Sequence, residues 1–307
     1  MVSHRSVACL LTAGLLLASC QSFTPNSPMP DSAAEETSLP RTSTPEPDYV
    51  EKLRNVEYQL GFTDALRVVQ LTDGKYEQGV NGSDEYISVS MTDFTAHGAL
   101  NGDGTDEYIA LVSENYGGSG EFVFLVVFSE VNGRLVFQTS VLVDDRPQVN
   151  ELSIDRNSIL LDTVVHDSDE PMCCPTLHTT RHYQLINNQL DMVDYVTFTP
   201  DNRPRTISIT SPSDGAEVFN SIQIKGSVAI APFENNLTYR IFDVGGVELA
   251  IGSITVKAAE LGGPGAFDES ISLGKILSGA AIRVEVQDIS AKDGSLLAMN
   301  SVELVVK

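Results

Sequence analysis

The sequence predicts an all-β, mostly antiparallel protein with two folded blocks. No stretch keeps a helical hydrophobic period, apart from one turn of helix expected around Tyr49–Arg54. Apolar and polar residues instead alternate along many short segments, which is the pattern of half-buried strands. Gly, Asn and Asp stand between these segments and favour tight turns. The chain is therefore expected to fold into β-sheets joined by hairpins.

The chain begins with an export signal, predicted over residues 1–19. A short basic head precedes an apolar run from Val7 to Ala18, which is shorter than the roughly 20 residues that span a bilayer. The run ends in the letters LASC at Cys20, and this ending resembles the bacterial lipobox. The resemblance implies that Cys20 carries lipid, such as palmitate, and becomes the first residue after cleavage. The alternative is an ordinary secretory signal with a chance cysteine.

Residues 20–48 are predicted to hold the lipidated cysteine and a disordered tether. The segment is rich in Pro, Ser and Thr and has few apolar residues, so burial cannot offset the entropy lost on ordering. A flexible coil of this length reaches on the order of 30 Å. We therefore expect a cell-envelope protein, held by its lipid anchor in the outer leaflet of the cytoplasmic membrane, or in the outer membrane of a Gram-negative host.

The first folded block is predicted over residues 49–200 as an antiparallel β meander. Asn132 and Gly133 favour a type I′ hairpin turn, because both central residues of this turn need positive φ. The run Phe122–Phe128 is apolar on both faces and predicts a central strand. Strands are expected at 85–90, 107–113, 121–130, 134–143, 151–155, 158–165, 179–186 and 190–198.

The second block, residues 203–307, carries seven short strand segments separated by turns, which favours a β-sandwich. It has no Cys and no Trp, so the hallmarks of antibody domains are missing. The segments ITSPSDGAEV, IKGSV, FENNLTYRIFDVGG and DISAKDGS, in this order between Thr206 and Lys307, resemble the immunoglobulin-like domain associated with bacterial spore germination. The resemblance implies an immunoglobulin-like β-sandwich that serves as an extracytoplasmic binding or spacer module, with no catalytic residues.

Charge and cysteine content narrow the function. The chain has 19 basic and 42 acidic residues and a net charge of −23, and such a field repels nucleic acid and anionic lipid head groups. Nucleic-acid binding is therefore not expected. Cleavage would remove Cys9 and lipid would block Cys20, which leaves Cys173 and Cys174 as the only thiols. Without a disulfide framework, stability must come from hydrophobic cores.

The segment NGDGTDE is a candidate calcium loop. Oxygen ligands at short intervals around a glycine suit a hard cation, and the segment resembles the calcium loops of integrin-type β-propeller repeats. The candidate ligands are Asn101, Asp103, Asp106 and Glu107. Ala99 stands where those loops have their first aspartate, and this loss should weaken binding. The alternative is a polar turn, and no cofactor other than this calcium is expected.

Cys173 and Cys174 stand side by side between two prolines, in the segment PMCCPT. In an oxidising compartment they can pair only with each other or with another molecule, so a vicinal disulfide that holds a turn is predicted. Two alternatives are that the thiols are reduced and inert, or that they form a redox switch. The acidic neighbours disfavour a redox switch because they raise the pKa of a thiol. A zinc or copper site with His166, His178 and His182 also stays open, although adjacent cysteines rarely bind one ion.

A Gly-Gly-Ser-Gly segment at 117–120 is expected to be a hairpin loop, since neither a Lys-Ser/Thr pair nor a helix follows it. The ordered set NGDGTDE, GGSG, VLVDDRPQVNELSI and HDSDEPMCCPT, between about Leu53 and Leu190, resembles a bacterial envelope lipoprotein domain of unknown function with GDG, GGSG and MCCPT motifs. The chain departs from that domain at Ala99 and at Asp144, where the domain has Gly-Asp-Arg. The resemblance implies no reaction.

We therefore expect a non-catalytic, lipid-anchored envelope protein that binds or spaces another envelope protein or cell-wall glycan. No histidine stands in a recognisable catalytic motif, and carboxylates are too frequent in so acidic a chain to single out a pair. No enzyme activity and no catalytic residue are therefore predicted. The alternative is a metal- or redox-responsive envelope protein that uses the degenerate calcium loop or the vicinal cysteine pair.

Overall fold

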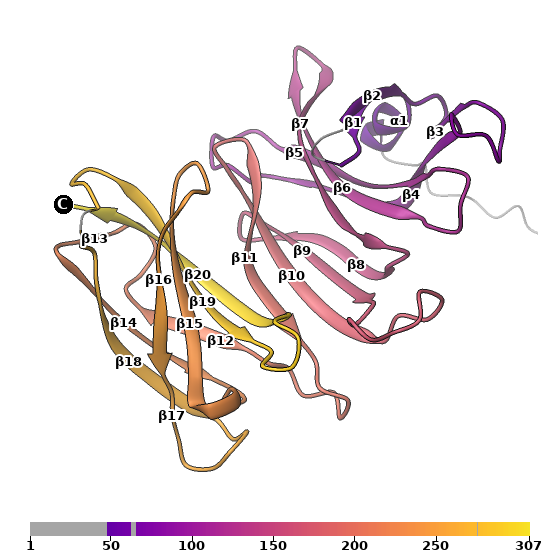
Figure 1. The fold of residues 1–307 in the computed structure, drawn as a ribbon. Coiled ribbons are helices and arrows are strands. Elements are labelled where there is room, and N and C mark those ends of the chain that lie inside the picture. Colours follow the sequence, from indigo (N-terminus) through magenta and orange to yellow (C-terminus); the bar gives the residue numbers. More distant parts are fainter. Residues whose placement is uncertain (1–47, 63–65, 275) are drawn as a thin grey trace, which may run out of the picture. The chain divides into compact units, whose positions relative to one another are not determined.

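The computed structural model describes residues 48–62, 66–274 and 276–307 (Figure 1). These residues fold into β-sheets with one α-helix, so the all-β, mostly antiparallel prediction is confirmed. The predicted export signal, Cys20 and almost all of the tether lie outside the described residues and stay predictions. No helix in the described part of the chain is long and apolar enough to cross a membrane.

The first block begins with helix α1 (Asp48–Arg54), at the place where one helical turn is expected. A hairpin of β1 and β2 follows, and then two antiparallel runs of strands, β3-β4-β5-β6-β7 and β8-β9-β10-β11, in which sequence neighbours pair. The predicted antiparallel meander is confirmed. Its strands are β1 (Glu57–Leu60), β2 (Arg67–Gln70), β3 (Lys75–Gln78), β4 (Ile87–Gly98), β5 (Glu107–Asn115), β6 (Phe122–Val131), β7 (Arg134–Asp145), β8 (Gln148–Asp155), β9 (Ser158–Val165), β10 (Leu177–Ile186) and β11 (Gln189–Thr197).

Strands β5 and β6 are buried on both faces. One face packs against α1 and the β1–β2 hairpin through a core that includes Leu53, Tyr58 and Phe128. The opposite face packs against β8–β11 through a second core, which includes Leu125 and Leu161. A strand enclosed in this way needs apolar side chains on both sides. The apolar run of β6 therefore occupies the central position that the sequence indicates.

The turn between β6 and β7 also follows the sequence prediction. Asn132 and Gly133 have φ values of 53° and 78°, and a type I′ turn needs positive φ at both central positions. The turn fixes the register of the hairpin, in which Val131 pairs with Arg134.

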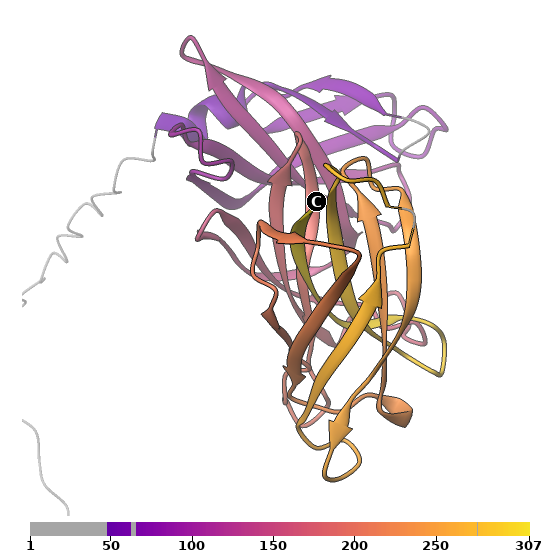
Figure 2. The ribbon, with the colours of Figure 1, turned by 90° about the vertical axis from the view of Figure 1, so that its left-hand side faces the viewer.

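The second block is a β-sandwich, as predicted, and Figure 2 shows its orange and yellow strands from a second direction. One sheet has the order β12-β14-β18-β17, and the other contains β16-β15-β19-β20. Buried and exposed residues alternate along β14, and the two sheets enclose a core that includes Ile224, Ile241 and Val284. The elements are β12 (Ile207–Ser211), β13 (Ala216–Val218), β14 (Ser221–Val228), the 3-10 helix η1 (Phe233–Asn235), β15 (Asn236–Asp243), β16 (Glu248–Thr255), β17 (Lys257–Ala258), β18 (Gly265–Ser272), β19 (Ala281–Ile289) and β20 (Leu296–Val306).

The two predicted blocks share one sheet. Strand β11 pairs with β20 over three residue pairs, and this pairing joins β8–β11 to the β16-β15-β19-β20 sheet. The side-chain amide of Asn300 on β20 donates a hydrogen bond to Asp194 on β11 at 2.8 Å. Residues 46–307 form a single compact unit. The domain boundary expected between residues 200 and 203 stays a prediction.

Candidate functional site

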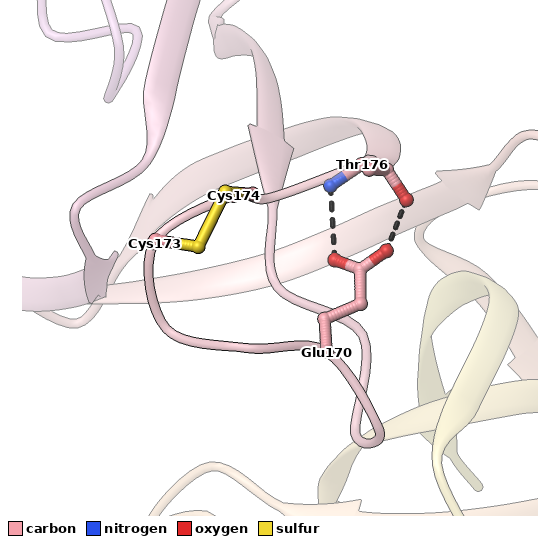
Figure 3. Close-up of a disulfide and its surroundings, with 4 residues drawn as sticks. All are labelled: Glu170, Cys173, Cys174 and Thr176. Atoms are coloured by element: carbon pink, nitrogen blue, oxygen red, sulfur yellow. Dashed lines mark hydrogen bonds between the residues drawn. A yellow bond between two sulfur atoms is a disulfide. The ribbon is translucent and has the colours of Figure 1, made fainter.

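The segment between β9 and β10, residues 166–176, carries the adjacent cysteines and is called the cysteine loop below. The carboxylate of Glu170 organises it: one oxygen accepts a hydrogen bond from the backbone N–H of Thr176 at 2.9 Å, and the other accepts from the Thr176 hydroxyl (Figure 3). The first oxygen also accepts from the backbone N–H of Asp167 at 3.1 Å. The hydroxyl of Thr176 is the main reason that the pKa of Glu170 is lowered. The loop is therefore closed by a charged carboxylate.

The cysteines lie at the exposed end of this loop. The backbone N–H of Cys174 donates to the carbonyl oxygen of Pro171 at 3.1 Å, which makes a tight turn. The Cα atoms of Cys173 and Cys174 are 3.8 Å apart, as across a trans peptide, and their sulfur atoms are in contact (Figure 3). The two side chains are thus placed as a vicinal pair. The disulfide bond itself stays a prediction.

The Gly-Gly-Ser-Gly loop and the Asp-Asp-Arg segment meet where β6 begins and β7 ends. The backbone N–H of Glu121 donates to Asp145 at 2.8 Å, and the backbone N–H of Arg146 donates to the carbonyl oxygen of Glu121 at 2.6 Å. The guanidinium of Arg146 contacts both carboxylate oxygens of Asp145, at 3.0 and 2.9 Å. Burial raises the pKa of Asp145, but these donors more than offset it, and the pKa is lowered.

His166 connects this contact to the cysteine loop. The electrostatic field of its imidazole contributes to lowering the pKa of Asp145 and of Glu170. Both ring nitrogens of His166 are buried and lack a hydrogen-bond partner within the described structure. The imidazole of His166 thus acts electrostatically on one carboxylate of each segment, and the sequence does not indicate this.

His178 and His182, both on β10, do not join the cysteines. His178 Nε2 lies 2.9 Å from Asp162, and its ring stacks on Phe198 with centroids 4.1 Å apart. His182 Nδ1 lies 3.3 Å from Asp194. In the described part of the chain, no three His, Cys, Asp or Glu side chains are grouped as metal ligands. Each of the two histidines is instead paired with its own carboxylate.

The candidate calcium loop forms a hydrogen-bonded turn before β5. The amide nitrogen of Asn101 donates to Asp103 at 3.1 Å and to Glu107 at 2.9 Å. Asp103 also accepts from the backbone N–H of Thr105 at 2.8 Å, and its pKa is lowered mainly by the Thr105 hydroxyl. The donor side of Asn101, rather than its oxygen, faces the carboxylates. The oxygens that calcium would need are therefore engaged within the turn.

The remaining candidate ligands of this loop point to different partners. Glu107 is 1% exposed and accepts a hydrogen bond from the backbone N–H of Leu100 at 2.8 Å, and burial raises its pKa. Asp106 is half exposed and lies 3.4 Å from His97. The loop precedes β5, whereas the Gly-rich loop follows it. The two motifs therefore lie at opposite ends of the same strand.

The tip of the cysteine loop contacts the turn between β19 and β20. The hydroxyl of Ser168 donates to Asp293 at 2.5 Å, and Lys292 forms an ion pair with Asp169. The Ser168 hydrogen bond is the largest cause of the lowered pKa of Asp293. These residues are ordinary polar loop residues, so no sequence signal distinguishes them.

Sequence reasoning also missed a buried ion pair at the end of β5. The side chain of Glu114 is fully buried, and Arg67 Nη1 lies 2.6 Å from one of its oxygens. The hydroxyl of Tyr116 donates to the other oxygen at 2.6 Å. Burial, followed by this hydrogen bond to Glu114, raises the pKa of Tyr116 to about 12. A glutamate near the end of an apolar strand is the one signal that could have pointed to it.

The fold defines the class of protein: an all-β chain whose second block is an antiparallel sandwich. Residues 206–295 match Gmad2, the immunoglobulin-like domain of bacterial spore germination. The match confirms the resemblance inferred for the second block and its immunoglobulin-like fold. No curated protein matches the chain. The lipoprotein assignment and the resemblance of the first block to an envelope lipoprotein domain stay predictions.

Proposed function

We propose that the chain is a non-catalytic, lipid-anchored protein of the cell envelope that binds or spaces another envelope protein or cell-wall glycan. The observation that carries this proposal is the match of residues 206–295 to an immunoglobulin-like domain of bacterial spore germination. Sandwiches of this kind present loops and strand edges on a rigid core, which suits binding better than chemistry. The match does not imply that the host forms spores.

The anchor is the second part of the proposal. The apolar run that ends at Cys20 and the proline-rich segment after it support a lipid anchor with a flexible tether. The folded block would then stand on the order of 30 Å from the bilayer. Its net charge of −23 favours partners that are neutral or basic and disfavours nucleic acid.

Three side chains around the cysteine loop, Asp145, Glu170 and His178, are engaged in ways that suit a binding rather than a catalytic role. Asp145 accepts hydrogen bonds from Glu121 and Arg146, and Glu170 accepts one from Thr176 of its own loop. His178 is paired with Asp162 and stacked on an aromatic ring. A catalytic base or nucleophile needs a group that is free to meet substrate. The cavity of about 530 Å³ beside His178, which residues of both blocks line, is a candidate binding surface.

Metabolic labelling with palmitate tests the anchor, and a pull-down tests the binding role. We expect label in the natural chain and in a Cys9→Ser control, and none in Cys20→Ser, because only Cys20 follows the small residues of the signal. Undiminished label in Cys20→Ser would remove the anchor from the proposal. Cross-linked pull-down from envelope fractions should recover a protein or glycan, and equal recovery with an unrelated lipoprotein as bait would contradict a specific binding role.

A redox-responsive role is the second candidate, and the exposed contact between Cys173 and Cys174 favours it. A thiol reductant would convert the disulfide to two thiols and add two hydrogen atoms, about 2 Da, to the intact mass. The redox role requires that this change alter the melting temperature or partner binding. If reduction changes the mass and neither property, the bond is a structural clasp.

A further inference from the structure

The edge of the second block at β16 has the properties of a docking site for an additional strand. Strand β16 is the last strand of its sheet and pairs only with β15 among the described residues (Figure 1). Its outer side therefore presents backbone N–H and C=O groups that no neighbouring strand of the described fold takes up. An unpaired edge of this kind is a template for an extended chain.

Apart from one bulge at Leu249, β16 lacks the usual protection of an edge strand. Proteins block such edges with charged side chains, proline, bulges or very short strands. Residues 249–255 (LAIGSIT) contain no charge and no proline. The one charged residue of β16 is Glu248, at its first position, and the neighbouring Arg240 forms an ion pair with it. Most of the edge is therefore open to an approaching strand.

The other sheet edges of the described fold are protected. At the opposite end of the same sheet, β8 carries Glu151 and Asp155 and an irregular register after Val149. Strand β12 is bulged, and the backbone N–H of Ile209 donates to the side chain of Asn300 at 3.2 Å. Strand β7 is contacted by β1, and the edge strands β2, β3, β13 and β17 have at most four residues. The stretch of β16 from Ala250 to Thr255 is by contrast regularly paired and uncharged.

Apolar side chains gather beside the β16 edge. Leu249 is 42% exposed and Ile251 is 53% exposed, and the register shifts at Leu249 so that it has no partner on β15. Leu249 and the exposed Leu277 line a cavity of about 500 Å³, together with Leu273 and Ile276. An added strand could place one apolar side chain in this cavity, while its backbone pairs with β16. The site therefore offers both hydrogen bonds and apolar contact.

We propose that the β16 edge binds an extended segment of a partner protein, with apolar residues at alternate positions and basic residues on both flanks. The backbone edge selects an extended chain, and the apolar side chains select the alternation. Asp243 lies at one end of the edge and Glu234 near the other, where the Asn235 carbonyl accepts from Val256. The exposed Lys257 follows β16 at the second end, but the two carboxylates and the net charge of −23 together favour basic flanks.

A second copy of this chain is the less favoured occupant. Two copies, each with a net charge of −23, would repel when they approach edge to edge. The repulsion falls with salt, so self-association at high salt is a distinct outcome of the test. The inference rests on the proposed binding role, but it concerns a surface that can be tested without knowing the natural partner.

The test uses residues 21–307 and fluorescent ten-residue peptides. The first probe is Lys-Lys-Val-Thr-Val-Thr-Val-Thr-Lys-Lys. The second has glutamate in place of the four lysines, and the third has proline in place of the first two threonines. We expect the first to bind with a dissociation constant of about 100 µM or below, the second at least about tenfold more weakly, and the third not measurably. Fluorescence anisotropy measures all three.

A matched pair of variants locates the site. Ile251→Lys should weaken the first peptide at least about tenfold, because it places a like charge on the edge. Val131→Lys should leave binding unchanged, since Val131 is 50% exposed but lies on β6 of the first block. If Ile251→Lys lowers the melting temperature of the protein, Ile251→Thr replaces it in the test, because threonine keeps a β-branched side chain. It should weaken binding about threefold.

Three results would decide against the inference. No binding of the first peptide at about 1 mM, or equal weakening by Ile251→Lys and Val131→Lys, overturns it. Sedimentation that shows a dimer of the natural chain, lost in Ile251→Lys, assigns the edge to a second copy instead. The proposed function fails separately, when pull-down with the natural chain recovers no envelope component. Peptide binding is measured on purified protein and does not depend on that result.

Discussion

Replacing Arg67 by alanine should destabilise the fold through Glu114. The carboxylate of Glu114 is fully buried, Arg67 lies 2.6 Å from one of its oxygens, and Tyr116 donates to the other. The guanidinium of Arg67 also lies 4.9 Å from the ring centroid of Tyr116. In Arg67→Ala, the buried carboxylate keeps a single neutral donor side chain and loses its counter-ion.

The structure sets the expected size of this effect. Removing one partner of a buried ion pair costs about 3–5 kcal/mol. The Arg67 side chain is 24% exposed, and Tyr116 can still donate its hydrogen bond in the variant, so we expect a smaller loss of about 2–3 kcal/mol. In a unit of this size, the melting temperature should fall by about 5–10 °C. Thermal unfolding followed by circular dichroism measures the change.

Two controls separate the ion pair from other causes. Arg156 is 90% exposed and pairs with the half-exposed Asp155, so Arg156→Ala should change the melting temperature by less than about 1 °C. Adding Glu114→Gln to Arg67→Ala should recover more than half of the loss, because no charge then stays buried. A melting temperature of Arg67→Ala within about 1 °C of the natural chain would refute the reasoning, as would the absence of recovery.

Three further predictions address the calcium loop, a buried carboxyl group and a close backbone contact. Calcium or EDTA should move the melting temperature by less than about 1 °C, since Asp103 already accepts hydrogen bonds; a larger calcium shift that Asp103→Asn abolishes would contradict this. Burial raises the pKa of Asp288 in the folded protein above the unfolded value of about 3.9. The protonated carboxyl group therefore stabilises the fold below a pH of about 3.9, and this stabilisation is lost as the pH rises through the pKa of the folded state. Asp288→Asn should therefore stabilise the protein at pH 7 and not at pH 3, and calorimetry at both values tests the sign. A Cβ at Gly226 would clash with the carbonyl oxygen of Ser208, whereas one at Gly118 would meet nothing within 4 Å. Gly226→Ala should therefore lower the melting temperature by several degrees, and Gly118→Ala should not. Equal melting temperatures of the two variants would count against the contact.

Much of the fold follows from local patterns that the sequence carries openly. The apolar run of β6 places that strand between two cores, and Asn132 and Gly133 supply the positive φ of its hairpin turn. The alternation in β14 gives the sandwich one buried and one exposed face. Each of these features depends on neighbours in sequence. They were therefore predictable without knowing which distant strands would meet.

The pairing of β11 with β20 was not predictable on these grounds. It joins strands about a hundred residues apart through three residue pairs, and the most specific contact is one amide of Asn300 on Asp194. Neither residue has an unusual setting in the sequence, and many registers would satisfy the same alternation. The choice depends on the summed packing of both blocks, which a local pattern does not record.

The candidate site was predictable only in part. The adjacent cysteines and the Gly-rich loop are visible as motifs. The contact of Glu121 with Asp145 and Arg146 depends on strand order, and Arg146 adopts a φ of 52°, which few non-glycine residues do. At the Asn101 turn the sequence shows an oxygen spacing that suits a cation, but it does not show that donors of the turn engage those oxygens.

The enclosure of β5 and β6 between two cores has a consequence for hydrogen exchange. Their backbone N–H groups can meet solvent only after a covering layer has separated, either α1 with the β1–β2 hairpin or strands β8–β11. Amides of these two strands should therefore be the slowest to exchange, at a rate that reports the free energy of global unfolding. Amides of β16, with one unpaired side, should exchange through local fluctuations long before them.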